Sequence, residues 1–189
     1  MQFWKERQFE GTYKVNSHTS TLELLDRHGR TSVYTKKQTV TFTQNGVFAI
    51  QDQAWGDGDI FARYTCSPGV IADKYKEGYR WKVLISLQAT RNRNEQEEFL
   101  IERTIKDGFL TSTCNFQVQV DHPTDLLTLS VIFPSKCHPK SVMLIEQNLK
   151  KHHTLDKSLS SRLSRGRTQY QWTVQKPRLF ESFILRWTW

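Results

Sequence analysis

The sequence predicts an all-β domain in which consecutive antiparallel strands form a meander closed into a barrel. Apolar and polar residues alternate along many segments, which is the pattern of half-buried strands. Aromatic residues make up 12% of the 189 residues, more than a disordered chain carries. A long meander avoids exposed edges by closing on itself, so we expect one barrel of roughly eight to ten strands over residues 1–189.

The segments that support this prediction run almost the length of the chain. Phe3 to Gln8 is expected to form a short N-terminal helical turn, and Thr39 to Thr43 then alternates threonine with apolar residues. Similar apolar rows occur at Trp81–Leu87, Phe99–Ile105, Phe116–Val120, Leu127–Phe133, Tyr170–Val174 and Phe183–Trp189. No window of comparable length keeps the 3.6-residue period of a helix.

Turn-forming residues separate these rows. Asn45-Gly46 and Asp107-Gly108 are strong hairpin signals, and Gly56 to Asp59 can also reverse the chain. Lys176-Pro177 lies between the last two rows, where proline suits a turn better than a central strand. We therefore expect these dipeptides to join neighbouring strands as hairpins.

The positive charge is concentrated in the last third of the chain. Residues 1–133 hold 16 basic and 16 acidic residues, whereas residues 134–189 hold 11 basic and 3 acidic ones. The basic, serine-rich stretch from Lys150 to Arg167 can be a mobile loop or carry a short helix near 155–163. It predicts a nucleic-acid or anionic-surface site, with a solvated basic loop as the alternative. The candidate anion-binding residues are Lys150, Lys151, Arg162, Arg165 and Arg167.

Catalytic and metal-binding patterns are weak. Cys66, Cys114 and Cys137 lie far apart, so we expect reduced thiols and a cytoplasmic location. No C-x-x-C, H-E-x-x-H or G-x-S-x-G pattern occurs, and we therefore expect no metal, no cofactor and no catalytic residues. No stretch is apolar enough to cross a bilayer, and the N-terminus lacks the apolar region of a signal peptide.

The two chain ends resemble a known superfamily. Phe9 to Val15, with Gly11 and Tyr13, is similar to the opening strand of calycins, the lipocalins and fatty-acid-binding proteins. Phe183 to Trp189 resembles the last strand of such barrels, although an aromatic residue does not follow Arg186 at the spacing of their carboxylate motif. The resemblance implies a lipocalin-like β-barrel.

That resemblance makes a soluble, non-enzymatic binding protein the leading expectation. Its barrel would hold a small hydrophobic ligand with an acidic group, such as a lipid, pigment or isoprenoid. The candidate ligand-binding residues are Trp81, Arg103, Phe116, Leu129, Trp172, Leu185 and Arg186. A chromophore lyase or isomerase on the same fold is the enzymatic alternative, and a buried salt bridge is the structural alternative for the two arginines.

Overall fold

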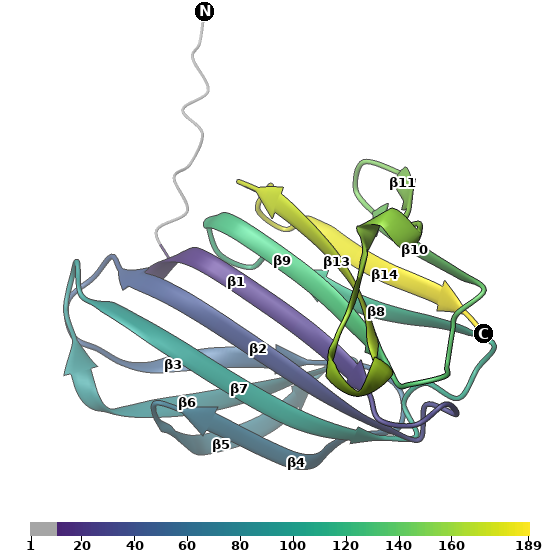
Figure 1. The fold of residues 1–189 in the computed structure, drawn as a ribbon. Helices are drawn as coiled ribbons and strands as arrows, with labels where there is room; N and C mark the ends of the chain where they lie inside the picture. The colour runs from purple at the N-terminus through teal and green to yellow at the C-terminus, as the bar shows by residue number, and fades with distance from the viewer. Residues whose placement is uncertain (1–10) are drawn as a thin grey trace, which may run out of the picture.

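The computed structural model describes residues 11–189, and almost all regular structure in that range is β-strand (Figure 1). The first half holds β1 (Tyr13–Leu24), β2 (Thr31–Phe42), β3 (Val47–Ala54), β4 (Asp59–Ser67), β5 (Val70–Glu77), β6 (Arg80–Arg91) and β7 (Gln96–Lys106). The second half holds β8 (Thr113–Gln119), β9 (Thr124–Phe133), β10 (Ser141–Glu146), β11 (Lys151–Thr154), β12 (Ser160–Arg162), β13 (Thr168–Gln175) and β14 (Ser182–Thr188). The predicted helical turn at Phe3 to Gln8 lies outside the described residues.

The all-β prediction is confirmed, but the closed barrel is wrong. The strands form three open sheets with the orders β12-β13-β9-β1-β2-β7-β4, β11-β10-β14-β8 and β3-β6-β5. Strands β1 and β9 run parallel, with Val15 opposite Thr124 and Glu23 opposite Ile132. A parallel pair needs a long connection, so the chain is not a simple meander. In Figure 1, β9, β1, β2 and β7 run side by side across the molecule.

The turn dipeptides mark turns, but the turns do not make hairpins. Asn45-Gly46 leads from β2 to β3, and Asp107-Gly108 leads from β7 toward β8. In both cases the two strands belong to different sheets. The Gly56 to Asp59 turn and Lys176-Pro177 likewise join strands of different sheets. A glycine or proline specifies how sharply the chain bends, while the partner of the next strand is decided by packing across the whole molecule.

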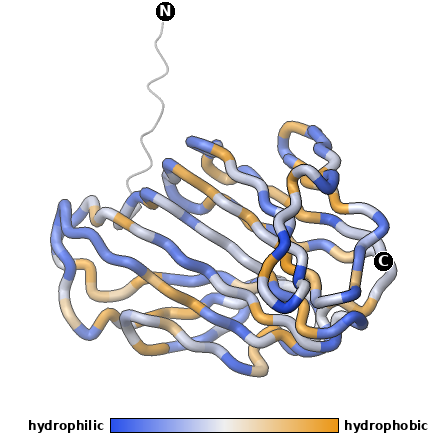
Figure 2. The backbone as a smooth tube through the Cα atoms, in the orientation of Figure 1, coloured by the Kyte–Doolittle hydropathy of each residue, from blue (hydrophilic) through white to orange (hydrophobic). Residues whose placement is uncertain are grey.

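The seven-stranded sheet packs against both smaller sheets. One core cluster joins Leu22 of β1 and Leu129 of β9 to Leu144 and Leu185 of the four-stranded sheet. A second cluster joins residues of β1 and β2 to β3 and β6 of the three-stranded sheet, with Val83 fully buried. Figure 2 shows hydrophilic and hydrophobic residues following one another along the strands, which is the alternation expected from the sequence.

The C-terminal strand closes the first core cluster with aromatic rings. Trp187 is fully buried and lies 5.4 Å from Phe109 and 5.8 Å from Phe133, measured between ring centroids. Trp189 packs edge-on against both Phe133 and Trp187. The aromatic end of the chain therefore fills the core between two sheets.

The basic segment folds as short turns and strands. The helix predicted near 155–163 is a single 3-10 turn at Lys157–Leu159, capped by the Asp156 side chain and followed by β12. A second 3-10 turn lies at Ser164–Gly166. Leu155 is buried whereas Leu159 is exposed, so the four-residue spacing of the leucines does not mark one apolar face. No helix within residues 11–189 is long and apolar enough to cross a membrane.

Trp187 is the residue whose loss should destabilise this fold most clearly. We expect Trp187→Ala to lower the free energy of unfolding by about 3–5 kcal/mol, because it leaves a large cavity in the core. Phe48→Ala is the control, since that ring is 70% exposed and its removal should change stability by less than about 0.5 kcal/mol. Urea unfolding of the three proteins measures both values, and equal effects would contradict this account of the core.

Candidate functional site

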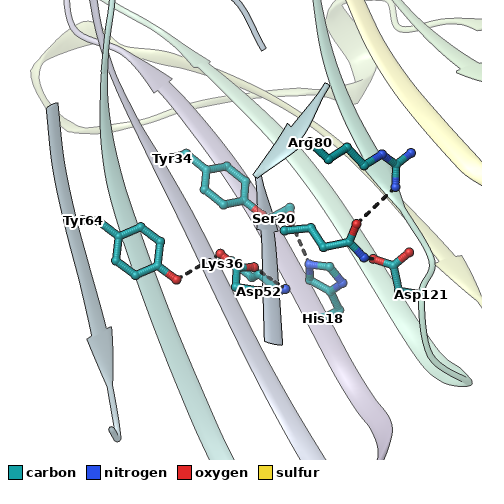
Figure 3. A network of polar contacts seen from close by, with 9 residues as sticks. His18, Ser20, Tyr34, Lys36, Asp52, Tyr64, Arg80 and Asp121 are labelled. Carbon is teal, nitrogen blue, oxygen red and sulfur yellow. Dashed lines mark hydrogen bonds and ion pairs between the residues drawn. The ribbon is translucent and has the colours of Figure 1, made fainter. Parts of the chain in front are cut away.

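The candidate site lies along a seam between the two smaller sheets. Strand β3 ends one of these sheets and β8 ends the other, and within residues 11–189 the two edges do not pair with each other. The link between them is made by side chains: Gln53 Nε2 donates a hydrogen bond to Asp121 Oδ2 at 3.1 Å. Arg80 Nη1 in turn donates to Gln53 Oε1 at 3.2 Å (Figure 3). Polar side chains therefore join the two small sheets along this seam.

Two cavities lie beneath the seam. The larger, which we call the seam cavity, has a volume of about 280 Å³. Its charged and polar lining includes His18, Tyr34, Lys36, Gln53, Arg103 and Asp121. The second cavity, of about 240 Å³, shares His18, Lys36, Gln53, Gln119 and Asp121 with the first. The shared residues form a polar partition that both cavities contact.

Beside the cavity, a buried ion pair connects the seven-stranded sheet to the three-stranded sheet. Lys36 Nζ of β2 donates to Asp52 Oδ1 of β3 at 3.0 Å, and Tyr64 Oη of β4 donates to Asp52 Oδ2 at 3.1 Å. Burial alone would raise the pKa of Asp52, but Lys36, Arg103 and these hydrogen bonds bring it below its ordinary value. Burial would lower the pKa of Lys36, but Asp52 raises it. Both groups are therefore ionised at neutral pH.

A second polar chain runs along β1 and β2. His18 Nε2 forms a hydrogen bond of 2.8 Å with Ser20 Oγ, which lies 3.1 Å from Tyr34 Oη. Burial, with the positive charge of Lys36, lowers the pKa of His18 to about 3, so the ring is neutral at ordinary pH. A neutral histidine beside a serine suggests a nucleophile and its base. Ser20 is fully buried and does not line the seam cavity, so a substrate there could not reach it.

Arg103 projects from β7 into the seam cavity. Its side chain is buried, and its guanidinium carbon lies 4.4 Å from the centre of the Tyr34 ring. The Nε and Nη1 atoms are buried and have no hydrogen-bond partner. An arginine normally uses these donors when it is removed from water. This residue therefore combines a buried positive charge with unused hydrogen-bonding capacity.

Exposed residues form the mouth of the cavity. Asp57 and Thr113 line the cavity and are exposed at the surface. Asp57 lies in the turn before β4, which is held close to the end of β7 by Gly58. Gly58 has a φ of +73°, and a Cβ there would lie 2.1 Å from the Lys106 carbonyl oxygen. Only glycine fits this approach, so the turn has a fixed place at the mouth.

The structure brings two of the predicted ligand-binding residues together in the seam cavity. Arg103 and Phe116 both line it. The other five lie elsewhere: Leu129 and Leu185 are fully buried in the core, Trp81 packs on Phe61, Trp172 packs on His153, and Arg186 donates to Asn115. A role for any of the seven in ligand binding stays a prediction.

The predicted anion-binding residues lie on the surface of the basic segment. Lys150, Lys151, Arg162 and Arg165 are exposed. Arg167 differs from them, because its guanidinium forms an ion pair with Glu23 of β1 and hydrogen bonds with Ser164. An anionic partner at these residues stays a prediction, and the ion pair of Arg167 leaves that side chain less available for it.

The residues at the centre of the site were not predicted from the sequence. Asp52 lies on an inward-facing row between Ile50 and Ala54, and Lys36 lies on the row that holds Tyr34 and Val40. A charged residue on such a row must be paired, and this pattern could have identified both residues. No local signal indicates that they pair with each other, because they belong to strands of different sheets.

Within residues 11–189, no group of three or more histidine, cysteine, aspartate or glutamate side chains could hold a metal ion. The three cysteines are free thiols, as expected. Burial raises the pKa of both Cys66 and Cys137, so neither thiol is activated as a nucleophile.

No protein-family model and no curated protein matches the chain. Solved structures do resemble it: an M1 zinc metallopeptidase from Deinococcus radiodurans matches with a TM-score of 0.51 at 9% identity, over 92% of this chain and 42% of that one. A two-domain form bound to L-tryptophan gives 0.54 at 10% identity with the same coverage. A candidate protease from Parabacteroides distasonis gives 0.53 at 10% identity, over 94% of this chain and 40% of that one.

These similarities correct the expected family and function. These neighbours are peptidase-related structures, not calycins, and no sheet within residues 11–189 closes into a barrel. The prediction that this chain carries a hydrophobic ligand inside a barrel is therefore wrong. The alternative of a lyase or isomerase depended on the same barrel and is also wrong. At this identity the likeness establishes a shared fold alone. The chain spans about two fifths of the length of these structures.

The buried histidine gives the fold a defined dependence on pH. His18 remains neutral when folded but binds a proton below its ordinary pKa of 6.5 when unfolded. The unfolded state therefore binds more protons between pH 6.5 and about 3, and the free energy of unfolding falls as the pH drops through that window. We expect His18→Gln, which does not titrate, to show a smaller fall than the wild type in urea unfolding.

The exposed His152 supplies the control for that experiment. His152→Gln should give the same unfolding curves as the wild type, because the ring is exposed and its removal disturbs no packing. His122, whose pKa is lowered to about 4 by burial and by Lys36, should leave a residual fall in the His18→Gln protein. An unchanged slope in His18→Gln would show that His18 is not buried in its neutral form.

Proposed function

We propose that this chain is a non-catalytic domain that binds a short peptide in the seam cavity. The observation that carries the proposal is a cavity of about 280 Å³ with a mixed polar and apolar lining and an exposed mouth, in a fold shared with peptidase-related structures. The volume is close to the lower end of ordinary ligand sites. One of the similar structures is described as bound to a Tyr-Ser-Ala substrate, so peptides are the ligand class that the comparison favours.

The chemistry of the described residues supports binding without cleavage. The zinc named for the similar structures has no set of ligands within residues 11–189, and the sequence contains no H-E-x-x-H pattern. Ser20, the one serine beside a neutral histidine in the network, is fully buried. The cavity offers donors and acceptors for a peptide, and within residues 11–189 Ser20 is closed off from it.

The limited coverage of the similar structures suggests how such a domain works. It corresponds to 42% of a protein described as a two-domain zinc metallopeptidase. We infer that this chain acts beside a separate catalytic module. It would either present a peptide to that module or receive a peptide from it. Residues 1–189 would form a single domain in this arrangement, and its three free thiols suit a cytoplasmic location.

Calorimetric titration with the tripeptide Tyr-Ser-Ala tests the proposal. We expect saturable binding with a Kd on the order of 1 mM or tighter, since the cavity is small. Mass spectrometry of the same sample should find the peptide intact, with or without added zinc. Absence of binding at millimolar concentration would refute peptide binding, and zinc-dependent products would refute the non-catalytic assignment.

Two tryptophan substitutions locate the binding. Thr113→Trp places an indole at the mouth of the cavity and should reduce affinity at least about tenfold by steric exclusion. Thr65→Trp on β4 is the matched control, because Thr65 is also exposed but does not line the cavity. Equal affinities of the two variants would place the peptide outside the seam cavity.

A further inference from the structure

Arg103 is the charged residue of the seam cavity whose donors are least used. It is 7% exposed, and its Nε and Nη1 atoms have no hydrogen-bond partner. The ring of Tyr34 covers one face of the guanidinium at 4.4 Å, which compensates part of the charge. A ring stacked on the face leaves the donors at the edge of the guanidinium free, so the hydrogen-bonding need of Arg103 remains unmet.

The acidic groups around the cavity accept hydrogen bonds from residues other than Arg103. The two oxygens of Asp52 accept hydrogen bonds from Lys36 and from Tyr64, and Arg103 receives only their electrostatic attraction. Asp121 accepts from Gln53, and the positive charges that act on it are those of Lys36, Arg80 and Lys82. Burial raises the pKa of Asp121 above its ordinary value, which weakens it further as a counter-ion.

Asp57 is the remaining acidic residue in the lining. It is exposed at the mouth, in the turn between β3 and β4, where water screens its charge. Arg103 is buried on β7, and within residues 11–189 no carboxylate forms an ion pair with it. The cavity therefore contains a buried cation without a bonded anion.

We propose that Arg103 binds the carboxylate of the ligand, and this inference rests on the proposed function of the seam cavity as a peptide site. Arg103 lines the cavity, and its planar guanidinium carries N–H groups that match the two oxygens of a carboxylate. Because Nε and Nη1 are closed to solvent, neighbouring side chains must shift for a carboxylate to reach them. An isolated charge in a protein interior is costly, and a carboxylate removes this cost while satisfying the donors. The chemical class is a carboxylic acid, most directly the C-terminal group of a short peptide.

The surroundings of Arg103 fit a peptide end of this kind. Phe116 lines the cavity and packs edge-on against Tyr34 at 5.7 Å, which provides an apolar wall. Asn115 and Gln117 also line the cavity along β8, while their side chains bond Arg186 and Gln147. A carboxylate seated on Arg103 would leave the preceding peptide unit along β8, toward the mouth at Thr113.

The experiment compares Tyr-Ser-Ala with its C-terminal amide on the wild-type protein. The two peptides differ by one carboxylate, so no substitution in the protein is needed for this step. We expect the acid to bind roughly ten- to a hundredfold more tightly than the amide, the range expected for a charge-assisted pair. Equal affinities would overturn the inference about Arg103 while leaving the peptide site intact, whereas no binding of either peptide would overturn the proposed function itself.

Substitutions then assign the effect to Arg103. Arg103→Gln should weaken the acid to about the affinity of the amide and leave the amide itself unchanged, and Arg103→Lys should recover only part of the loss because it lacks the fork. Arg63→Gln on β4 is the matched control, since Arg63 is exposed and does not line the cavity. An acid preference that survives Arg103→Gln in the folded variant would overturn the assignment.

Succinate distinguishes the two sources of a carboxylate. Weaker binding of succinate than of Tyr-Ser-Ala would support a peptide carboxylate on Arg103. If succinate instead binds more tightly than the peptide and loses this binding in Arg103→Gln, the carboxylate site stands and the peptide assignment falls. Calorimetry on the full chain gives all of these affinities, and thermal unfolding confirms that each variant is folded.

Discussion

The ion pair between Lys36 and Asp52 is the constraint around which the interior is arranged. It joins the large sheet to the three-stranded sheet, with Asp52 buried and Lys36 partly buried. Breaking one side of a buried pair costs about 3–5 kcal/mol, so the two strands are held in one relative position. The pair also brings a polar environment into the core. Asp52 accepts a hydrogen bond from the hydroxyl of Tyr64, and the charge of Lys36 adds to the burial that lowers the pKa of His18.

A core with such a polar centre cannot be closed by apolar packing alone. The two small sheets each pack on the large one with their own apolar cluster, and the polar residues occupy the seam between them. Among residues 11–189, strands β3 and β8 do not pair with each other there, and the side chains of Gln53 and Asp121 connect the two sheets. The cavity is thus a consequence of how the sheets divide, and the close approach that only Gly58 permits fixes its mouth.

Local sequence patterns predicted the strands but not their arrangement. The alternation of Thr39 to Thr43 and of Leu127 to Phe133 lies within β2 and β9, because a period of two follows from the geometry of a single strand. Asn45-Gly46 correctly marks a turn, yet the next strand joins another sheet. Which edges pair is decided by contacts between residues far apart in the chain, and the parallel pairing of β1 with β9 has no local signature.

The same distinction explains why Arg103 was found and its surroundings were not. A charge that interrupts an apolar row is visible in one strand, and the structure places this side chain in the seam cavity. Arg186 has a similar sequence context, but strand alternation puts it on the opposite face from Leu185, where it meets Asn115. Whether a buried charge is satisfied depends on residues brought in by other strands. The sequence could therefore identify Arg103 as a buried cation. Only the three-dimensional arrangement shows that no carboxylate within residues 11–189 forms an ion pair with it.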